Sequence, residues 1–394
     1  MPHTPELPVL DTDSRPVFAP SPLRALRDET PVRRVRTPAG DEAWLVTRHA
    51  EAKELLHDDR LGRFHPAPAT APKYVDSPLV QMLIIDDADT AREMHGRSRA
   101  LLGPQFAARR MQELRPRVAT AAQAIAADFA DREQPADLHR HFALPYSLSI
   151  LHELIGVPAE ERERATQLLT DIGRIGKDGE DAPGPGPLFA LFGALAEAKR
   201  TAPRDDVLTR LVTAGVPAEQ AAALAATLLM AGLESVASFI TLGVALLTRH
   251  PERLRTSLDG PEAMAGLVEE VLRNGKQSGS VLPRYAAADI DVAGVTIRAG
   301  DLVLLDFALA NHDERVFEHA GEFDPGRAPN PHLSFGHGIW HCLGASLARI
   351  ELAEAFTALF GHMPGLRPAV PHEQLVTSAG RLVGGPAELP VRWY

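Results

Sequence analysis

The stretch Phe335-Gly336-His337-Gly338-Ile339-Trp340-His341-Cys342-Leu343-Gly344 holds the only cysteine of a 394-residue chain. Glycines lie on both sides of this cysteine, and an apolar-periodic segment predicted to be a helix over 343–360 follows it. Glycine lets a backbone turn tightly and approach a large, flat group. The start of a helix supplies about half a positive charge and unpaired N–H groups, and positive potential favours a thiolate. The stretch therefore predicts a thiolate presented on a loop as a metal ligand.

A lone cysteine is more often a small buried apolar side chain than a ligand. The glycine spacing reverses that preference here, because a soft thiolate on a glycine-rich loop suits haem iron. The stretch resembles the haem-binding loop of the cytochromes P450, Phe-Gly-x-Gly-x-(His/Arg)-x-Cys-x-Gly. It departs from that pattern only at Trp340, where the family has a basic residue. The resemblance implies that Cys342 is the axial ligand and that Phe335, Gly336, His341 and Gly344 line the cofactor.

Composition places the chain among ordinary soluble proteins. Hydrophobic residues make up 45% and charged residues 24%, and the net charge of −11 argues against nucleic acid as a partner. One cysteine cannot form an intrachain disulfide, which fits a reducing cytoplasm. Residues 1–22 are rich in proline, predict an extended arm, and lack the apolar core of a signal peptide or membrane anchor. We expect a cytoplasmic monomer with one domain over 1–394.

Residues 217–249 form the longest helical candidate and are nearly all apolar. A membrane span is the alternative, but Glu234 at its middle would cost roughly 3 kcal/mol on insertion scales. A helix that is apolar all round is typical of a protein core. An acid followed by an alcohol, Glu234-Ser235, could relay protons there, although Ser235 could equally bond its own helix. The segment resembles the family's oxygen-binding groove, Ala-Gly-x-(Asp/Glu)-Thr, with Ser235 in place of threonine.

Three basic residues are the predicted partners of the haem propionates. His95 and Arg99 lie four residues apart on one face of a helix, and Arg284 follows a segment at 274–282 that reads as loop or strand. Taken alone, His95 and Arg99 would indicate only a solvated helix face. The resemblance implies propionate contacts for all three, since charge-assisted hydrogen bonds are the strong ones.

Glu270-Val271-Leu272-Arg273 resembles the family's Glu-x-x-Arg element, and Arg327 is placed as its third member. Most such pairs are surface ion pairs of little energetic weight. Here the resemblance implies a structural trio that braces the cysteine side of the haem rather than reacting.

The remaining pattern predicts two short strands at 32–35 and 43–46, a helix at 49–56 and a long loop at 60–83. Helical periodicity over 91–131 is expected to break near Gly103-Pro104 and again at Pro116. Further helices are predicted at 138–155 and 158–175, then an irregular segment at 176–187 and strands within 290–305.

The resemblance covers nearly the whole chain and implies a mainly α fold with small β-sheets. A long buried helix would lie over the haem, with the cysteine loop on the opposite face. The implied function is a haem b monooxygenase that uses O2 to oxidise a hydrophobic small molecule, in bacterial natural-product biosynthesis. Electrons from NAD(P)H would arrive through a ferredoxin or flavodoxin and its reductase, and Arg109 and Arg110 are candidate docking residues.

Three other functions are compatible with parts of the sequence. The same haem site could drive a peroxygenase or an oxidative coupling enzyme. A non-catalytic haem scaffold is disfavoured by the retained Glu234 and Ser235. A haem-free Cys–His hydrolase using His341 or His337 ranks last, because nothing in the sequence indicates an oxyanion site.

Overall fold

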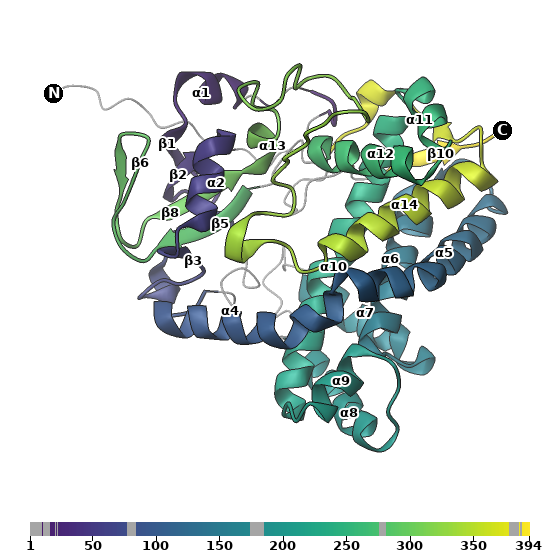
Figure 1. Ribbon diagram of the computed structural model, residues 1–394, viewed down its shortest axis with the longest axis horizontal. Helices are drawn as coiled ribbons and strands as arrows, with labels where there is room; N and C mark the ends of the chain where they lie inside the picture. The colour runs from purple at the N-terminus through teal and green to yellow at the C-terminus, as the bar shows by residue number, and fades with distance from the viewer. Residues whose placement is uncertain are drawn as a thin grey trace.

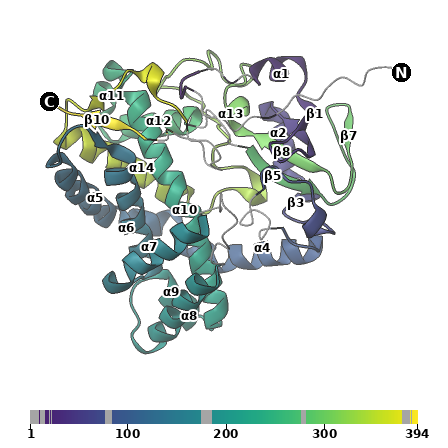
Figure 2. The same ribbon diagram turned by 180° about the vertical axis from the view of Figure 1, so that it is seen from behind.

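A long helix, α10 (Ala218–Leu247), passes through the middle of the molecule (Figures 1 and 2). The computed structural model describes residues 10, 16–19, 21, 23–76, 84–173, 185–275, 281–377, 386 and 388–394. Helix α10 packs against α6 (Leu144–Ile155), α8 (Gly186–Thr201) and α14 (Ala345–His362). By length and apolarity α10 could cross a membrane, but 56% of its most apolar window is buried inside the protein. The predicted core helix is therefore confirmed.

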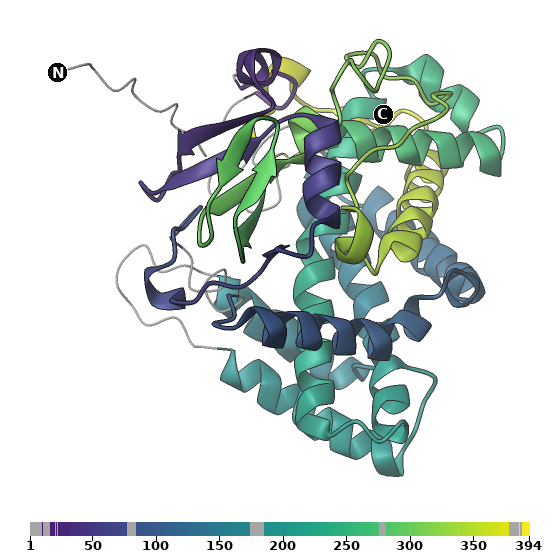
Figure 3. The same cartoon turned by 60° about the vertical axis from the view of Figure 1, so that its left-hand side comes forward.

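A five-stranded sheet forms the other side of the molecule, which Figure 3 brings forward. Its order is β1-β2-β8-β5-β3. The bounds are Val32–Arg36 for β1, Glu42–Val46 for β2, Leu61–Gly62 for β3, Val281–Ala286 for β5 and Leu302–Asp306 for β8. The β2–β8 pairing is parallel, with Trp44 opposite Val303, whereas the other pairings are antiparallel. Every residue of β8 is buried, which explains its continuous apolar run.

Two smaller sheets complete the β structure. One joins β6 (Ile290–Val292) to β7 (Val295–Ile297), and the other has the order β4-β10-β9. The latter three strands are Ala136–Asp137, Pro390–Arg392 and Arg367–Pro368. A mainly α fold with small sheets is what the sequence predicted.

The other helices enclose α10 or flank the sheet (Figure 1). They are α1 (Arg24–Glu29), α2 (His49–His57), α4 (Ala88–Leu102), α5 (Ala108–Ala130), α7 (Ala159–Gly173), α9 (Val207–Thr213), α11 (Pro251–Ser257), α12 (Pro261–Asn274) and α13 (Phe307–Ala310). A π-helical turn, His139–Ala143, precedes α6. Single turns of 3₁₀ helix lie at Pro68–Thr70, Gly103–Phe106, Gly338–Trp340 and His372–Gln374.

One predicted helix break is wrong. Helix α4 does end at Gly103-Pro104, but α5 continues through Pro116. Proline removes only its own N–H from the helix, and the Pro116 carbonyl accepts a hydrogen bond from Thr120 Oγ1 at 2.9 Å. The apolar face of α5, including Val118 and Ala122, is fully buried, and α5 packs along α14. Tertiary packing therefore outweighs the local cost of the proline.

Other local predictions differ in detail. The predicted loop at 60–83 contains the short strand β3 and a 3₁₀ turn, and its residues 77–83 lie outside the described ranges. In the predicted irregular segment at 176–187, residues 176–184 lie outside them too, while α8 already begins at Gly186. The proposed arm at 1–22 is described only at residues 10, 16–19 and 21.

Candidate active site

The cysteine loop turns on glycines before α14 begins. Gly336 and Gly338 have φ angles of +69° and +59°, in the left-handed region that side chains rarely adopt. A hydrogen bond of 2.7 Å from the Cys342 N–H to the Phe335 carbonyl closes the loop. Cys342 is exposed, and α14 starts three residues later at Ala345. The sulfur thus lies next to a helix N-terminus, where the helix dipole favours a thiolate.

Phe335 packs against charged side chains that link α12 to α14. The Arg349 guanidinium lies over its ring at 4.5 Å, and the His332 ring is 5.9 Å away. Glu269 accepts hydrogen bonds from Arg349 Nε at 2.6 Å and Nη2 at 2.9 Å, and lies 3.1 Å from His332 Nε2. Burial raises the pKa of Glu269, but these hydrogen bonds and the Arg349 charge outweigh it and bring the pKa to about 2. The ionised carboxylate therefore ties the loop to both helices.

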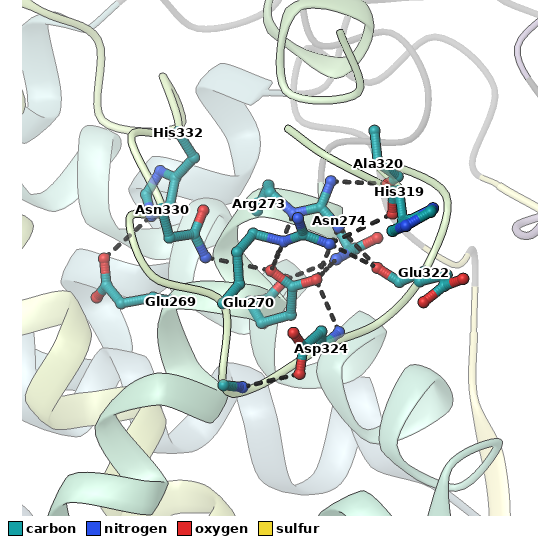
Figure 4. Close-up of polar contacts among 12 residues, drawn as sticks. Glu269, Glu270, Arg273, Asn274, His319, Ala320, Glu322, Asp324, Asn330 and His332 are labelled. Atoms are coloured by element: carbon teal, nitrogen blue, oxygen red, sulfur yellow. Dashed lines mark hydrogen bonds and ion pairs between the residues drawn. The ribbon is translucent and has the colours of Figure 1, made fainter. Parts of the chain in front are cut away.

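The Glu270–Arg273 pair is completely buried and is the centre of a second network (Figure 4). Arg273 donates to Glu270 through Nη2 at 2.7 Å and Nε at 2.9 Å. Its other N–H groups donate to the carbonyls of Asn311, Ala320 and Glu322 at 2.9–3.0 Å.

Glu270 has further donors from the segment that leads to the cysteine loop. The Asp324 N–H and Asn330 Nδ2 donate to it at 3.0 and 3.1 Å. Arg327 Nε lies 3.4 Å from Glu270 Oε2, as an ion pair without a hydrogen bond, while Arg327 Nη1 donates to the Glu318 carbonyl at 2.6 Å. The structure thus brings Glu270, Arg273 and Arg327 together, and the network fixes the path of the chain before the loop.

Helix α4 contributes His95 and Arg99, and both donate to carbonyls of the loop. His95 Nε2 lies 3.0 Å from the Ile339 oxygen, and Arg99 Nη1 lies 2.7 Å from the His341 oxygen. Because a carbonyl only accepts, Nε2 of His95 carries a proton. Burial, and then the neighbouring guanidinium charges, lower the pKa of His95 despite this bond.

Arg284 lies on β5 within a cluster of aromatic and basic groups. Its guanidinium is 4.6 Å from the centre of the Trp340 ring, and Arg63 lies over the same ring at 5.7 Å. Burial, followed by the Arg63 charge, lowers the pKa of Arg284 to about 9. Arg284 Nε and Trp340 Nε1 are buried without a hydrogen-bond partner among the described residues. Buried donors of this kind fit the two propionate carboxylates of a haem.

His341 belongs to a different neighbourhood. Its ring is 6.3 Å from that of Phe335, and the charges that act on its pKa come first from Arg349 and then from Arg99, after burial. It therefore does not lie in the cluster around Trp340. Arg63, in contrast, belongs to that cluster. No motif indicated it, since it follows a short strand within a segment that was predicted to be a loop.

Glu234 and Ser235 lie on the one stretch of α10 that is open over several residues. Residues 230–235 are only partly buried or exposed, whereas Leu229 and Val236 on either side are buried. Ser235 Oγ donates to the Ala231 carbonyl at 2.9 Å, which is the bonding within the helix that the sequence left open. Gly232 lets α6 come close, because a Cβ there would be 2.7 Å from Leu151 Cδ2.

Comparison with known proteins agrees with this geometry. The sequence model of the cytochrome P450 family matches residues 263–362. Pentalenolactone synthase of Streptomyces exfoliatus is 38% identical over 98% of this chain and 99% of its own length. Mycinamicin IV hydroxylase/epoxidase of Micromonospora griseorubida is 38% identical over 93% of this chain and 94% of its own. The solved structure of substrate-free cytochrome P450 PimD, a polyene macrolide antibiotic pimaricin epoxidase, has a TM-score of 0.92 and 49% identity, covering 98% of this chain and 99% of that one.

The fold and these relatives define a haem-thiolate oxidoreductase. The chain belongs to the cytochrome P450 family. It is a monooxygenase that uses haem with an axial cysteine thiolate, O2, and electrons passed from NAD(P)H by redox partners. The predictions of family, fold, enzyme class and cofactor are therefore confirmed.

Proposed function

We propose that this protein is a monooxygenase whose haem is held by Cys342 and that it oxidises a hydrophobic natural product of bacterial secondary metabolism. The single observation that carries the assignment is the exposed Cys342 at the start of α14. When bound, a thiolate-ligated haem activates dioxygen for insertion of one oxygen atom into the substrate. A natural-product substrate is supported by the names of three related proteins, which are pentalenolactone synthase, mycinamicin IV hydroxylase/epoxidase and pimaricin epoxidase.

The side chains have separate roles in this proposal. Phe335, Gly336 and Gly344 shape the surface that meets the cofactor, and Arg284 neutralises a propionate. Arg99 and His95 hold the loop carbonyls, and Arg99 has N–H groups left for the cofactor. The Glu270–Arg273–Arg327 trio keeps the preceding segment in place.

Proton supply is assigned to the open part of α10. Glu234 carries a carboxyl group and Ser235, the next residue, a hydroxyl, and both residues are only partly buried. An acid and an alcohol in sequence can pass protons from water to a bound ligand. Ser235 can take part when its hydroxyl turns away from the Ala231 carbonyl. The helix does not need that side-chain hydrogen bond for its stability.

The redox partner is proposed to be a small acidic ferredoxin or flavodoxin, and the protein to be cytoplasmic and monomeric. Of the two docking residues considered from sequence, only Arg109 remains suitable, since its side chain is 92% exposed. Arg110 lies 2.9 Å from Asp205, so a charge reversal there would break an internal ion pair. Arg109 also pairs with Glu113 on the same helix at 3.2 Å, but that pair is exposed and contributes little to stability. Reversal at Arg109 should therefore raise the KM for the partner protein with only a small effect on stability.

The decisive experiment is the absorption spectrum of the reduced protein with carbon monoxide. A thiolate-shifted Soret band is expected from the wild-type protein, and loss of that band from Cys342→Ala. Titration with macrolides and pentalenolactone-type compounds, followed by product analysis with O2, NAD(P)H and a ferredoxin system, then tests the substrate class. A purified protein without haem, or a thiolate-shifted band that survives Cys342→Ala, would refute the assignment.

A further inference from the structure

Arg63 is a basic residue at the haem site to which no motif assigns a role. It immediately follows strand β3, and its carbonyl accepts a hydrogen bond from the Ile85 N–H at 3.0 Å. Its guanidinium lies over the Trp340 ring at 5.7 Å, with Arg284 over the same ring at 4.6 Å. Two cations that do not share a sequence element are thus brought together on one indole ring.

These cations lack an acidic partner within the described part of the chain. Neither Arg63 nor Arg284 forms an ion pair there with a carboxylate, and the charge that acts on Arg284 is that of Arg63. Burial lowers the pKa of Arg63 as well. Arg284 is buried and Arg63 is partly buried. Two guanidinium groups placed on one ring with limited access to water cost free energy unless anions compensate them.

The other candidate donor in this neighbourhood is already engaged. His95 Nε2 donates to the Ile339 carbonyl at 3.0 Å, and the surrounding guanidinium charges oppose protonation of its second nitrogen. A neutral histidine with Nε2–H has only a lone pair on Nδ1, which repels a carboxylate. His341 packs beside Phe335 instead of beside Trp340. Arg99 uses Nη1 on the His341 carbonyl and has further N–H groups to offer the cofactor. The two guanidiniums on the Trp340 ring therefore supply positive charge to the propionates in addition to Arg99.

We propose that Arg63 is a propionate-binding residue of this enzyme and supplies the cation that position 340 does not carry. Trp340 then acts as the apolar wall on which both guanidiniums lie, and its unpaired Nε1–H can donate to the same carboxylate. This inference rests on the proposed haem ligation by Cys342. It assigns recognition of the cofactor's carboxylates to a segment that the sequence predicted only as a loop.

Haem release tests the proposal. The rate of haem transfer from the ferric holoprotein to excess apomyoglobin is measured for the wild type, Arg63→Gln and Arg63→Lys. Arg92→Gln is the matched control, because Arg92 lies on α4, its side chain is 48% exposed, and it forms an ion pair with Asp89 on the same helix. Loss of one charge-assisted hydrogen bond predicts release at least about tenfold faster in Arg63→Gln. Arg63→Lys should lie between it and the wild type, and Arg92→Gln should equal the wild type.

A double-mutant cycle with Trp340→His separates charge from structure. The new basic residue should slow haem release in Arg63→Gln and change it by less than about twofold when Arg63 is present. The haem midpoint potential should fall in Arg63→Gln and not in Arg63→Lys, since only the former removes a positive charge. Equal release from Arg63→Gln and the wild type, indistinguishable Gln and Lys variants, or the same Trp340→His effect in both backgrounds would overturn the proposal. The carbon monoxide spectrum of the wild type tests the assignment of Cys342 as haem ligand independently.

Discussion

Glu351 is a carboxyl group in the interior of α14, and its environment predicts an unusual dependence of stability on pH. The side chain is 2% exposed, and its Oε1 has no hydrogen-bond partner in the described structure. Burial raises the pKa of Glu351 to about 8, from an ordinary value of 4.5. The group is therefore protonated in the folded protein at neutral pH, although it would be ionised in the unfolded chain.

The sign and size of the effect follow from this difference. Between pH 4.5 and 8 the folded protein binds one proton more than the unfolded chain, so stability falls as pH rises. Each unit corresponds to about 1.4 kcal/mol, which gives about 3 kcal/mol of lost stability at pH 7 relative to pH 4.5. Replacing Glu351 with glutamine, which keeps the shape but does not titrate, removes this loss.

Apparent melting temperatures at a fixed scan rate provide the assay. With an unfolding entropy of about 2.1 cal/mol/K per residue over 394 residues, 3 kcal/mol corresponds to about 4 °C. The difference in melting temperature between Glu351→Gln and the wild type should therefore grow by about 4 °C in favour of the variant from pH 4.5 to pH 7. Glu351→Met serves as a second variant, because it removes titration without adding an amide.

The reasoning fails if the difference between variant and wild type stays constant across this pH range. It also fails if Glu351→Gln and Glu351→Met show opposite pH trends. In that case the slope would belong to the amide's hydrogen bonds and not to the buried carboxyl.

Three further changes test the site and the core. Glu270→Gln and Arg273→Met should each lower the free energy of unfolding by about 3–5 kcal/mol, because each leaves a buried charge without its partner. The double variant should lose clearly less than the sum of the two. Additive losses in urea denaturation would contradict this. Glu234→Gln should lower product formed per NAD(P)H consumed while the substrate-induced spectral shift persists, and unchanged coupling would exclude its proton role. Gly243→Ala should cost about 1–3 kcal/mol, because the new methyl group would meet the buried Phe356 ring, and an unchanged melting temperature would show that the α10–α14 contact adapts.

What the sequence could predict depended on local patterns with a fixed chemical meaning. The glycine spacing around Cys342 indicated a turn that the φ angles of Gly336 and Gly338 now show. The Glu270–Arg273 spacing placed two side chains on one helix face, and Arg327 reached them from a loop. The apolar run of α10 required a core position, since no other environment would cover it.

The features that the sequence did not reveal arise from contacts between distant segments. Arg63 has no local pattern, and only the closing of β3 onto β5 brings it to Trp340. Pro116 interrupts a helix by local rules, but the packing of α5 on α14 overrides that cost. The engagement of Arg110 by Asp205 likewise depends on a partner 95 residues away.

The parallel pairing of β2 with β8 has a consequence for the order in which the protein can assemble during synthesis. The indole Nε1 of Trp44 on β2 donates to Asp301, 257 residues later, at 2.8 Å. At about 5–20 residues per second, a ribosome needs about 13–50 s to produce the partner strand after β2 has emerged. During that interval the β1–β2 hairpin has an open edge of unpaired N–H and C=O groups. The N-terminal hairpin is therefore a segment of the nascent chain that needs shielding from aggregation until β8 has been made.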